Sequence, residues 1–370
     1  MSSRLTVVLV SLLLAAPVLT FFLWLMIQPT TEAIACPEEC RCERDGYLVD
    51  CSNTRLNNIP SILPAHVREL MLDGNNITFL ERDNFFSRGL IELEMISAVF
   101  CKIRRMKLGA FNGLTKLTYL SLKGNEISEI IPGVFENMNS LEFLYLGNNS
   151  IEHLYSEVFS GLVNLKNLSL EGNNLHYVHP DTFLELPNLQ LLYLGYNPYL
   201  QIPTYRNFIN SHSLTYLDIS NCSINSLSVE TFENVSALEW LALNDNNLRT
   251  VDINILRALP KLSTLYLYGN PLHCDFQLQE VWRWCKNRNI QTAYGKTAPE
   301  CYTPFEVKGM CWEVLETGQY LGGNILHYEF FNNRILLSPF SARGPIYRPH
   351  LCLRRMREAD VSAHFFQALQ

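Results

Sequence analysis

The sequence lacks the short motifs by which most enzyme classes are recognised. It contains no H-E-x-x-H, no G-x-S-x-G, no P-loop and no dinucleotide-binding fingerprint. It also lacks an excess of positive charge, because 29 Lys and Arg stand against 36 Asp and Glu and give a net charge of -7. We therefore expect neither an enzyme nor a bound cofactor. A nucleic-acid partner is disfavoured, since no excess of basic residues is available to neutralise phosphates.

Charged residues are also few, at 18%, whereas apolar residues make up 48% of the chain. That balance is enough to bury a core and excludes general disorder. Cysteine, in contrast, is abundant, because eleven cysteines are more than a reduced cytosolic domain normally carries. The odd number means that at least one cysteine cannot pair within the chain.

The N-terminal 35 residues have the pattern of a secretory signal. An uncharged apolar run over residues 5–27 follows Arg4, and an Ala-Ile-Ala sequence at residues 33–35 offers a cleavage site before Cys36. The alternative is an uncleaved anchor, because a run of this length can span a bilayer as a helix. Both readings place the rest of the chain outside the cell, either secreted or on the extracellular face of the plasma membrane, where disulfides form.

Apolar residues recur with a period of about 24 residues. The pattern L-x-x-L-x-L-x-x-N-x-L occurs nine times in phase, and this period indicates a solenoid. Within one copy, Leu144 and Leu146 alternate with Phe143 and Tyr145, as expected for a short strand with one buried face. The copies start at Val67, Leu93, Leu117, Leu141, Leu165, Leu189, Leu214, Leu238 and Leu262.

Two further columns of residues follow the same period. The ninth position of each copy carries an amide or a thiol, which can satisfy the backbone groups of a buried turn, so Cys101 and Cys222 are expected to be buried, unpaired thiols. Phenylalanine recurs eighteen residues after most starts, and we expect this column to pack in the core. The ninth positions are Asn75, Cys101, Asn125, Asn149, Asn173, Asn197, Cys222, Asn246 and Asn270, and the aromatic column is Phe85, Phe111, Phe135, Phe159, Phe183, Phe208 and Phe232, followed by Leu256.

Cysteine-rich segments flank the repeats. Cys36-x3-Cys40-x-Cys42-x8-Cys51 precedes them, and an Asn270-Pro271 segment with four further cysteines follows them. With the nine repeats, these segments resemble the extracellular leucine-rich repeat proteins that have cysteine-rich caps, such as Slit-like, Toll-like and connectin-like ectodomains. The resemblance implies an α/β solenoid, a horseshoe with a parallel concave β-sheet, loops and short helical turns on the convex side, and two disulfide caps. The expected divisions are a signal at 1–35, an N-terminal cap at 36–66, repeats at 67–273, a C-terminal cap at 274–315 and a poorly ordered tail at 316–370.

The resemblance also implies disulfide pairings. In the first cap it pairs Cys36 with Cys42 and Cys40 with Cys51, although four cysteines by themselves permit three connectivities. In the second cap we expect Cys274 with Cys301. Phe276 occupies the place of the family's second cysteine, so Cys285 with Cys311 is a weaker replacement, and the alternative is that both stay reduced. Cys352, in the tail, is an idle thiol or the site of an intermolecular bridge.

The outward positions of the strands are rich in aromatic and acidic residues. Aromatic side chains on an exposed rigid surface often concentrate binding energy, although tyrosine also suits a pleated surface without any partner. We expect a protein partner of basic character and leave the oligomeric state open. The candidate partner-binding residues are Tyr119, Phe143, Tyr145, Tyr193, Tyr216, Trp240, Tyr266, Tyr268, Glu142, Asp218 and Glu239.

Five N-x-S/T sequons are candidate glycosylation sites in a secreted chain. A glycan on the concave side would shield the middle of the face and shift contacts toward the Trp240 to Tyr268 end. The sequons begin at Asn76, Asn148, Asn167, Asn221 and Asn234.

The expected function is extracellular protein binding through the concave face, in cell adhesion or cell-surface recognition. A secreted matrix or scaffold protein with many weak contacts is the alternative, and a signalling receptor ectodomain is a remote one. His153, His176 and His179 fall on loops of consecutive repeats without a fixed ligand spacing, so we expect no metal site.

Overall fold

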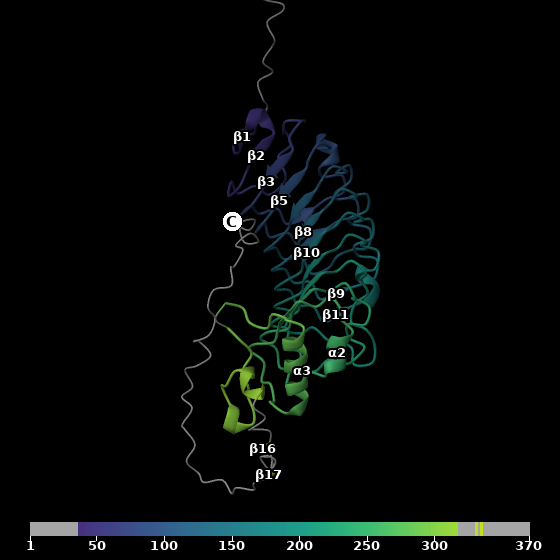
Figure 1. The fold of residues 1–370 in the computed structure, drawn as a ribbon. Coiled ribbons are helices and arrows are strands. Elements are labelled where there is room, and N and C mark those ends of the chain that lie inside the picture. Colours follow the sequence, from purple (N-terminus) through teal and green to yellow (C-terminus); the bar gives the residue numbers. More distant parts are fainter. Residues whose placement is uncertain (1–35, 296, 317–329, 332–333, 336–370) are drawn as a thin grey trace, which may run out of the picture.

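The protein is a curved solenoid. A computed structural model describes residues 36–295, 297–316, 330–331 and 334–335. Figure 1 shows the strands stacked one after another from the N-terminal cap to the C-terminal cap, with the connecting segments on the opposite side. In the part of the chain that is described, no helix has the length and apolar character needed to cross a bilayer. The apolar segment 5–27 lies outside that part.

The main sheet has eleven strands, and nine of them are contributed by the nine repeats. The first two belong to the N-terminal cap and pair antiparallel, whereas every other neighbouring pair is parallel. The predicted solenoid with its concave parallel sheet is therefore confirmed. In order the strands are β1 (Arg41–Glu43), β2 (Leu48–Asp50), β3 (Glu69–Met71), β5 (Met95–Ser97), β7 (Tyr119–Ser121), β8 (Phe143–Tyr145), β10 (Asn167–Ser169), β12 (Leu191–Tyr193), β13 (Tyr216–Asp218), β14 (Trp240–Ala242) and β15 (Thr264–Tyr266).

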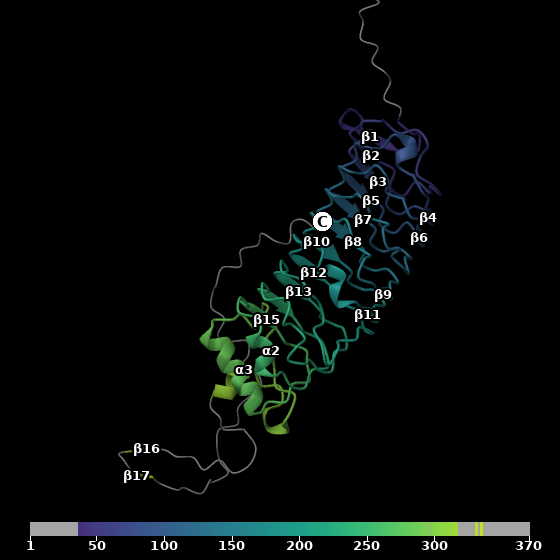
Figure 2. The same ribbon diagram turned by 90° about the vertical axis from the view of Figure 1, so that its right-hand side faces the viewer.

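The outer side consists of loops and short turns, as expected. It also carries two small parallel sheets, which Figure 2 shows away from the main sheet and which the sequence analysis did not predict, because two-residue strands leave no periodic signal. These sheets pair β4 (Phe79–Leu80) with β6 (Arg105–Met106) and β9 (His153–Leu154) with β11 (Tyr177–Val178). The helical segments are η1 (Arg44–Gly46), η2 (Phe86–Arg88), η3 (Pro180–Phe183), α2 (Ile253–Arg257), α3 (Phe276–Asn287), η4 (Phe305–Val307) and η5 (Trp312–Glu316), and an antiparallel pair, β16 (Phe330–Phe331) with β17 (Arg334–Ile335), lies in the tail.

The core consists of stacked leucine and phenylalanine layers. Leu144 and Leu146 are fully buried, and the predicted phenylalanine column is buried along its whole length. Phe111 and Phe135 stack with ring centroids 5.8 Å apart, and their neighbours repeat this geometry. Burial of each such ring contributes about 1.5–3 kcal/mol, so the column stabilises the solenoid over many repeats.

The asparagine column forms a hydrogen-bonded ladder, as expected. The Asn149 side chain donates to the carbonyls of Leu122 (3.0 Å) and Leu146 (2.9 Å) and accepts from the Ile127 N–H (3.0 Å). Cys101 takes the same place, and its thiol lies 3.0 Å from the Leu72 carbonyl. Each rung therefore satisfies backbone groups of its own repeat and of the preceding one.

The cysteines at both ends form caps. Disulfides join Cys36 to Cys42, Cys40 to Cys51 and Cys274 to Cys301, which are the pairings that the family resemblance implies. The caps shield the end layers of leucine from water.

The proposed pairing of Cys285 with Cys311 is wrong. Cys285 is a free thiol in α3, where it is fully buried among apolar side chains, and burial raises its pKa to about 12. Cys311 is itself disulfide-bonded, so it is not available to Cys285. Cys285 is thus a core residue of the C-terminal cap. Cys352 lies outside the described residues.

Candidate functional site

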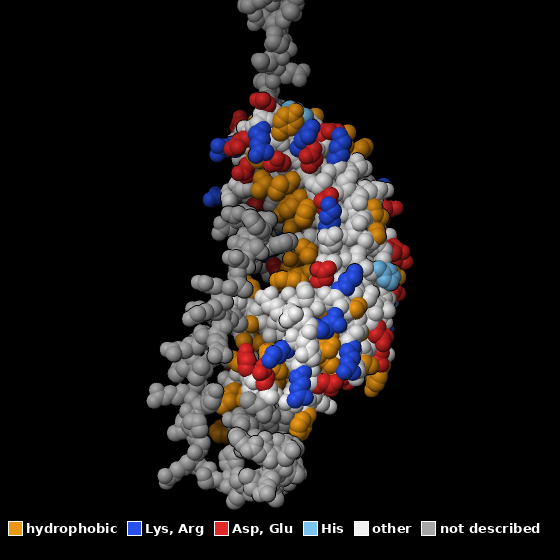
Figure 3. Space-filling model, in the orientation of Figure 1, with side chains coloured by type: hydrophobic (Ala, Val, Ile, Leu, Met, Phe, Trp, Pro, Cys, Tyr) orange, Lys and Arg blue, Asp and Glu red, His pale blue; other side chains and the backbone are white. Residues whose placement is uncertain are grey.

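The concave face of the main sheet presents two parallel rows of side chains. The strand register aligns Tyr119, Phe143, Asn167, Leu191, Tyr216, Trp240 and Thr264 in the first row. Two residues further along each strand, the second row contains Ser121, Tyr145, Ser169, Tyr193, Asp218, Ala242 and Tyr266. Figure 3 shows hydrophobic side chains gathered in a stripe along this inner side.

The aromatic residues of this face separate into two clusters. The N-terminal cluster contains Tyr119, Phe143 and Tyr145, and the Tyr119 and Tyr145 ring centroids lie 5.3 Å apart. The second, which we name the C-terminal cluster, runs through neighbouring rings separated by 5.0 to 5.9 Å. It consists of Tyr193, Tyr216, Trp240, Tyr266, Tyr268 and Tyr294. The structure therefore brings together five of the predicted aromatic residues in one cluster and the other three in a second.

Tyr294 was missed by the sequence analysis. It belongs to the C-terminal cap and contacts Tyr266 with a ring separation of 5.8 Å. The cap has no repeat register, so its position next to β15 could not be read from the period. An isolated bridge between Thr264 and Gln291 extends the main sheet by one step and places the cap segment beside it.

Strand β10 separates the two clusters because its outward residues are small and polar. Asn167 and Ser169 stand where neighbouring repeats carry Phe143 and Tyr145. Asn167 is 9% exposed, and its side-chain oxygen has no hydrogen-bond partner among the described residues. A buried acceptor without a partner costs free energy, so this position is an unsatisfied point in the middle of the face.

The aromatic residues are less exposed than an outward-facing position suggests. Trp240 is 37% exposed and Tyr266 only 6%, because neighbouring rings cover one another. Burial raises the pKa of Tyr145 to about 12 and also raises the pKa of Tyr193 and Tyr216. At neutral pH these phenols are therefore uncharged and can donate hydrogen bonds.

In the N-terminal half of the face, several acidic residues have cationic partners, whereas Asp73 accepts hydrogen bonds from the Ser97 hydroxyl and the Val99 N–H. Glu142 binds Lys166 at 2.8 Å, and Glu171 binds Lys123 at 3.0 Å. Similar pairs between neighbouring repeats join Arg44 to Glu69 and Arg68 to Glu94. The expected acidic surface is therefore largely neutralised here, and Glu142 does not present a free negative charge.

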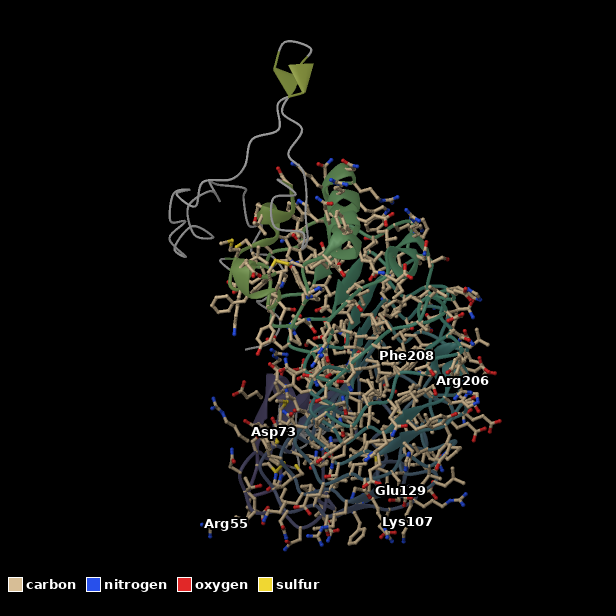
Figure 4. All side chains as sticks on the ribbon, turned by 90° about the horizontal axis from the view of Figure 1, so that it is seen from below. Arg55, Asp73, Lys107, Glu129, Arg206 and Phe208 are labelled. Atoms are coloured by element: carbon tan, nitrogen blue, oxygen red, sulfur yellow. A yellow bond between two sulfur atoms is a disulfide. The ribbon has the colours of Figure 1, made fainter. Side chains whose placement is uncertain are left out.

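The C-terminal half differs in its charge. From residue 167 to residue 248 the chain has one arginine, no lysine and eight Asp or Glu. The arginine, Arg206, is exposed and lies at the outer surface, near Phe208 and on the other side of the solenoid from Asp73 (Figure 4). No basic side chain of this segment therefore reaches the concave face.

Asp218 is the acidic residue at the centre of this half. One of its oxygens accepts a hydrogen bond from the Ser220 N–H at 2.8 Å. Burial raises the pKa of Asp218, and the negative charge of Glu171 raises it further. Within the described residues, Asp218, Glu239 and Asp245 form no salt bridge. Glu239 is exposed, and Asp245 accepts a hydrogen bond from the Asn244 side-chain amide at 2.8 Å.

Two aromatic residues at the rim adopt an unusual backbone conformation. Phe100 and Tyr196 have φ angles of 54° and 59°, a left-handed region in which Gly, Asn and Asp are favoured. Their rings are 64% and 61% exposed, so core packing does not offset the backbone strain. Both residues flank the concave rows and extend the aromatic surface to its edge.

The five sequons differ in accessibility. Asn167 is buried, and Asn221 is half-buried at the rim. The exposed sequons are Asn76, Asn148 and Asn234.

The three loop histidines do not form a metal-binding group. His153 and His176 have ring centroids 6.1 Å apart, but His176 stacks on Tyr199 at 5.0 Å, and His179 caps η3 by accepting from the Asp181 N–H at 3.2 Å. In the described part of the chain, His, Cys, Asp and Glu side chains form no group of three arranged to hold a metal ion.

Comparison with known proteins agrees with this architecture. The chain matches the family described as Leucine rich repeat over residues 91–151, 144–198 and 212–272. It is 29% identical to trophoblast glycoprotein of Macaca fascicularis over 277 residues, which cover 74% of this chain and 64% of that protein. The match to the Mus musculus protein covers 61% of its length, so the chain spans less than two thirds of these relatives.

Two solved structures share the fold. The crystal structure of human 5T4 (trophoblast glycoprotein) matches with a TM-score of 0.57 and 26% identity, covering 75% of this chain and 95% of that one. A chain from a complex of Latrophilin 3, Unc5D and FLRT2 matches with a TM-score of 0.51 and 22% identity, covering 75% of this chain and 96% of that one, which shows the fold alone. The matched repeats, the relatives and the disulfide-bonded ends identify this chain as an extracellular leucine-rich repeat protein with cysteine-rich caps.

Proposed function

We propose that this protein binds a protein partner through its concave face, in cell adhesion or cell-surface recognition, and that it acts without catalysis. The observation that carries the proposal is the C-terminal cluster of aromatic rings on a rigid parallel sheet. Aromatic anchors held by a rigid scaffold are the residues in which interface energy concentrates. Nine strands spaced by about 4.8 Å give a face about 38 Å long, which suits a protein and far exceeds what a metabolite needs.

The relatives support this assignment. Trophoblast glycoprotein is similar to this chain in sequence and fold, and FLRT2 occurs in a complex with Latrophilin 3 and Unc5D. We extend only the general mode to this chain, namely recognition of another protein at the cell surface. The charge of the face favours a partner of basic character, because Asp218, Glu239 and Asp245 form no salt bridge within the described residues.

The glycosylation sites fit the same proposal. Asn76, Asn148 and Asn234 are exposed, and none of them belongs to the two rows of strand side chains, although Asn148 has the repeat position that Phe100 and Tyr196 occupy at the rim. Asn167, which would place a glycan in the middle of the face, is buried. We therefore propose that the face stays open for a protein partner.

The test uses the full chain expressed in secretory cells. The protein is recovered from the medium and from the membrane fraction, and its N-terminus is sequenced; a medium form that begins at Cys36 supports signal cleavage. Binding to an array of cell-surface ectodomains is then compared for the unmodified chain, Trp240→Ala and Tyr205→Ala. Tyr205 is 94% exposed and lies outside the concave rows, so it provides the matched control.

Loss of the captured partner by Trp240→Ala but not by Tyr205→Ala is the expected result. Equal binding by both variants contradicts recognition through the concave face. Binding that is weak for every partner, depends steeply on salt and accompanies self-association would instead favour a matrix or scaffold role.

A further inference from the structure

We propose that the C-terminal cluster and Asp218 form a binding site for an arginine side chain of the partner. This inference deepens the proposed function, and it depends on the concave face being the binding surface. The site would hold the guanidinium group against the aromatic rings while the Asp218 carboxylate supplies the opposite charge.

Asp218 lies within the C-terminal cluster, because it pairs in register with Tyr193 on β12 and follows Tyr216 by two residues on β13. Burial, and after it the negative charge of Asp218, raises the pKa of both tyrosines, which agrees with this position. Tyr268 has a raised pKa from burial and from the charges of Asp245 and then Asp218. Asp218 is thus surrounded by rings of the C-terminal cluster on several sides. A carboxylate in such surroundings is stabilised by a cation more than one in water is.

Within the described residues, no cation of the protein's own contacts this site. Among the described residues, the cation–π contacts occur in or next to the caps, where Arg68 lies over Tyr47 at 5.2 Å, Arg288 over Trp284 at 5.1 Å and Lys308 over Tyr302 at 4.7 Å. The C-terminal cluster carries six rings but has no such contact within the same residues. The exposed part of the cluster, which includes Trp240 at 37% exposure, is therefore available to a cation from outside.

The residues that flank the Asp218 carboxylate in neighbouring repeats are small. Gly195 follows Tyr193 on the neighbouring repeat, and a Cβ at Gly195 would stand only 3.2 Å from an Asp218 oxygen. On the other side, Ala242 contributes only a methyl group to the same row. The absence of larger side chains at Gly195 and Ala242 leaves access to Asp218 between Tyr193 and Tyr266.

The planar shape of the guanidinium group favours arginine over lysine at this site. A guanidinium group is planar, so it can stack on a ring and still donate two parallel hydrogen bonds to one carboxylate. An ammonium group can make a point contact but cannot stack.

The test uses the full-length secreted chain and three immobilised peptides of the same Gly-Ser sequence. One contains three arginines, the second three lysines and the third three citrullines, which keep the shape of arginine but have no charge. We expect the arginine peptide to bind at least about tenfold more tightly than the other two, as charge-assisted hydrogen bonding predicts. Equal binding of the citrulline peptide, or of the lysine peptide, overturns the arginine assignment.

Three variants locate the site. Asp218→Asn keeps the acceptor for the Ser220 N–H but removes the charge, and we expect about a tenfold loss of arginine-peptide binding. Trp240→Ala should weaken binding as well. The control is Glu142→Gln, which removes a carboxylate on the same face that is already paired with Lys166. Thermal melts confirm folding, and full binding by a folded Asp218→Asn overturns the proposal.

The result separates this inference from the proposed function. If no arginine peptide binds while Trp240→Ala still abolishes capture of a cell-surface ectodomain, the arginine site is wrong and concave-face recognition stands. If Trp240→Ala leaves ectodomain capture intact while the arginine peptide binds through Asp218, the proposed function fails and the cation site remains.

Discussion

Lys123 reaches across an entire repeat to bind Glu171, and its ammonium nitrogen lies 3.0 Å from the carboxylate. The residue between them in the register is Gly147, whose missing side chain leaves the path open, because a Cβ there would stand 2.9 Å from the Glu171 Cγ. The pair links the strands on either side of β8 and neutralises Glu171. Further along the face lies Asp218, which forms no salt bridge within the described residues.

Removing this lysine should change binding more than stability. The two side chains are 39% and 37% exposed, so Lys123→Met should change the free energy of unfolding by less than about 1 kcal/mol. It leaves Glu171 negative beside Asp218 and should strengthen arginine-peptide binding at low salt. Lys116→Met, which removes the bridge to Glu92, is the control. Unchanged or weaker binding by Lys123→Met would show that Glu171 does not contribute to the field of the site.

The asparagine ladder should tolerate a thiol better than a methyl group. Asn149→Ala leaves the Ile127 N–H without a partner in the core and removes one of the two amide donors at each of the Leu122 and Leu146 carbonyls, and we expect a loss of about 2 kcal/mol in the free energy of unfolding. Asn149→Cys should cost less, because Cys101 and Cys222 already fill equivalent places. Urea denaturation measures both values. A larger loss for Asn149→Cys than for Asn149→Ala would contradict the role assigned to the thiols.

The repeat period predicted the fold closely, because each repeat places its residues in the same environment. Leu144, Phe135 and Asn149 occupy the core and the ladder that their positions indicate. The caps were less predictable: the disulfide between Cys274 and Cys301 follows the family pattern, whereas the fate of Cys285 depends on how α3 packs. The repeat period gives no information about segments outside the repeats, such as the C-terminal cap.

The sequence predicted which residues belong to the candidate site but not which contacts these residues make. The sequence indicates which side chains point outward, yet it does not show that Lys166 neutralises Glu142 or that Tyr266 is covered by its neighbours. These facts depend on contacts between repeats, and Tyr294 enters the C-terminal cluster from outside the period. Opposite charges at the same position of neighbouring repeats, such as Glu142 and Lys166, are the sequence signal that could have restricted the predicted acidic surface to the C-terminal half of the face.

The buried thiols should resist modification in the folded protein. Burial raises the pKa of Cys101 to about 11 and that of Cys222 and Cys285 to about 12. Few thiolates form at neutral pH, so iodoacetamide should label these cysteines only after unfolding. Mass spectrometry of native and denatured samples provides the measurement. Labelling of Cys285 in the native protein would contradict its position in the core of the C-terminal cap.

Glycan occupancy should follow exposure. We expect glycans at Asn76, Asn148 and Asn234, and none at Asn167, because a glycan at Asn167 would force a buried side chain out from between Phe143 and Leu191. Peptide mapping of the secreted protein with and without enzymatic deglycosylation measures occupancy at each site. Asn167→Gln should leave the mass of the protein's glycans unchanged. A glycan found at Asn167 would place a barrier between the two aromatic clusters and would contradict an open face.

The charge of Asp218 should destabilise the folded protein at neutral pH. Its pKa is raised by burial and by Glu171, and no cation faces it within the described residues, where its other titratable neighbours are Tyr193, Tyr216 and Tyr268. A raised pKa in the folded state means that the proton stabilises folding at low pH and that this contribution is lost as the pH rises through the raised pKa. Asp218→Asn should therefore unfold at a higher urea concentration than the unmodified protein at pH 7, with the difference shrinking as the pH falls toward 3.8, the ordinary value for the group.

Arginine-peptide binding should show the opposite trend and weaken over the same acidic range, because protonated Asp218 no longer attracts the cation. Two results together would contradict this assignment: an Asp218→Asn variant that is less stable than the unmodified protein at pH 7, and peptide binding that does not change with pH. They would show that the Asp218 charge does not destabilise the folded protein and that Asp218 is not the counter-ion of the site.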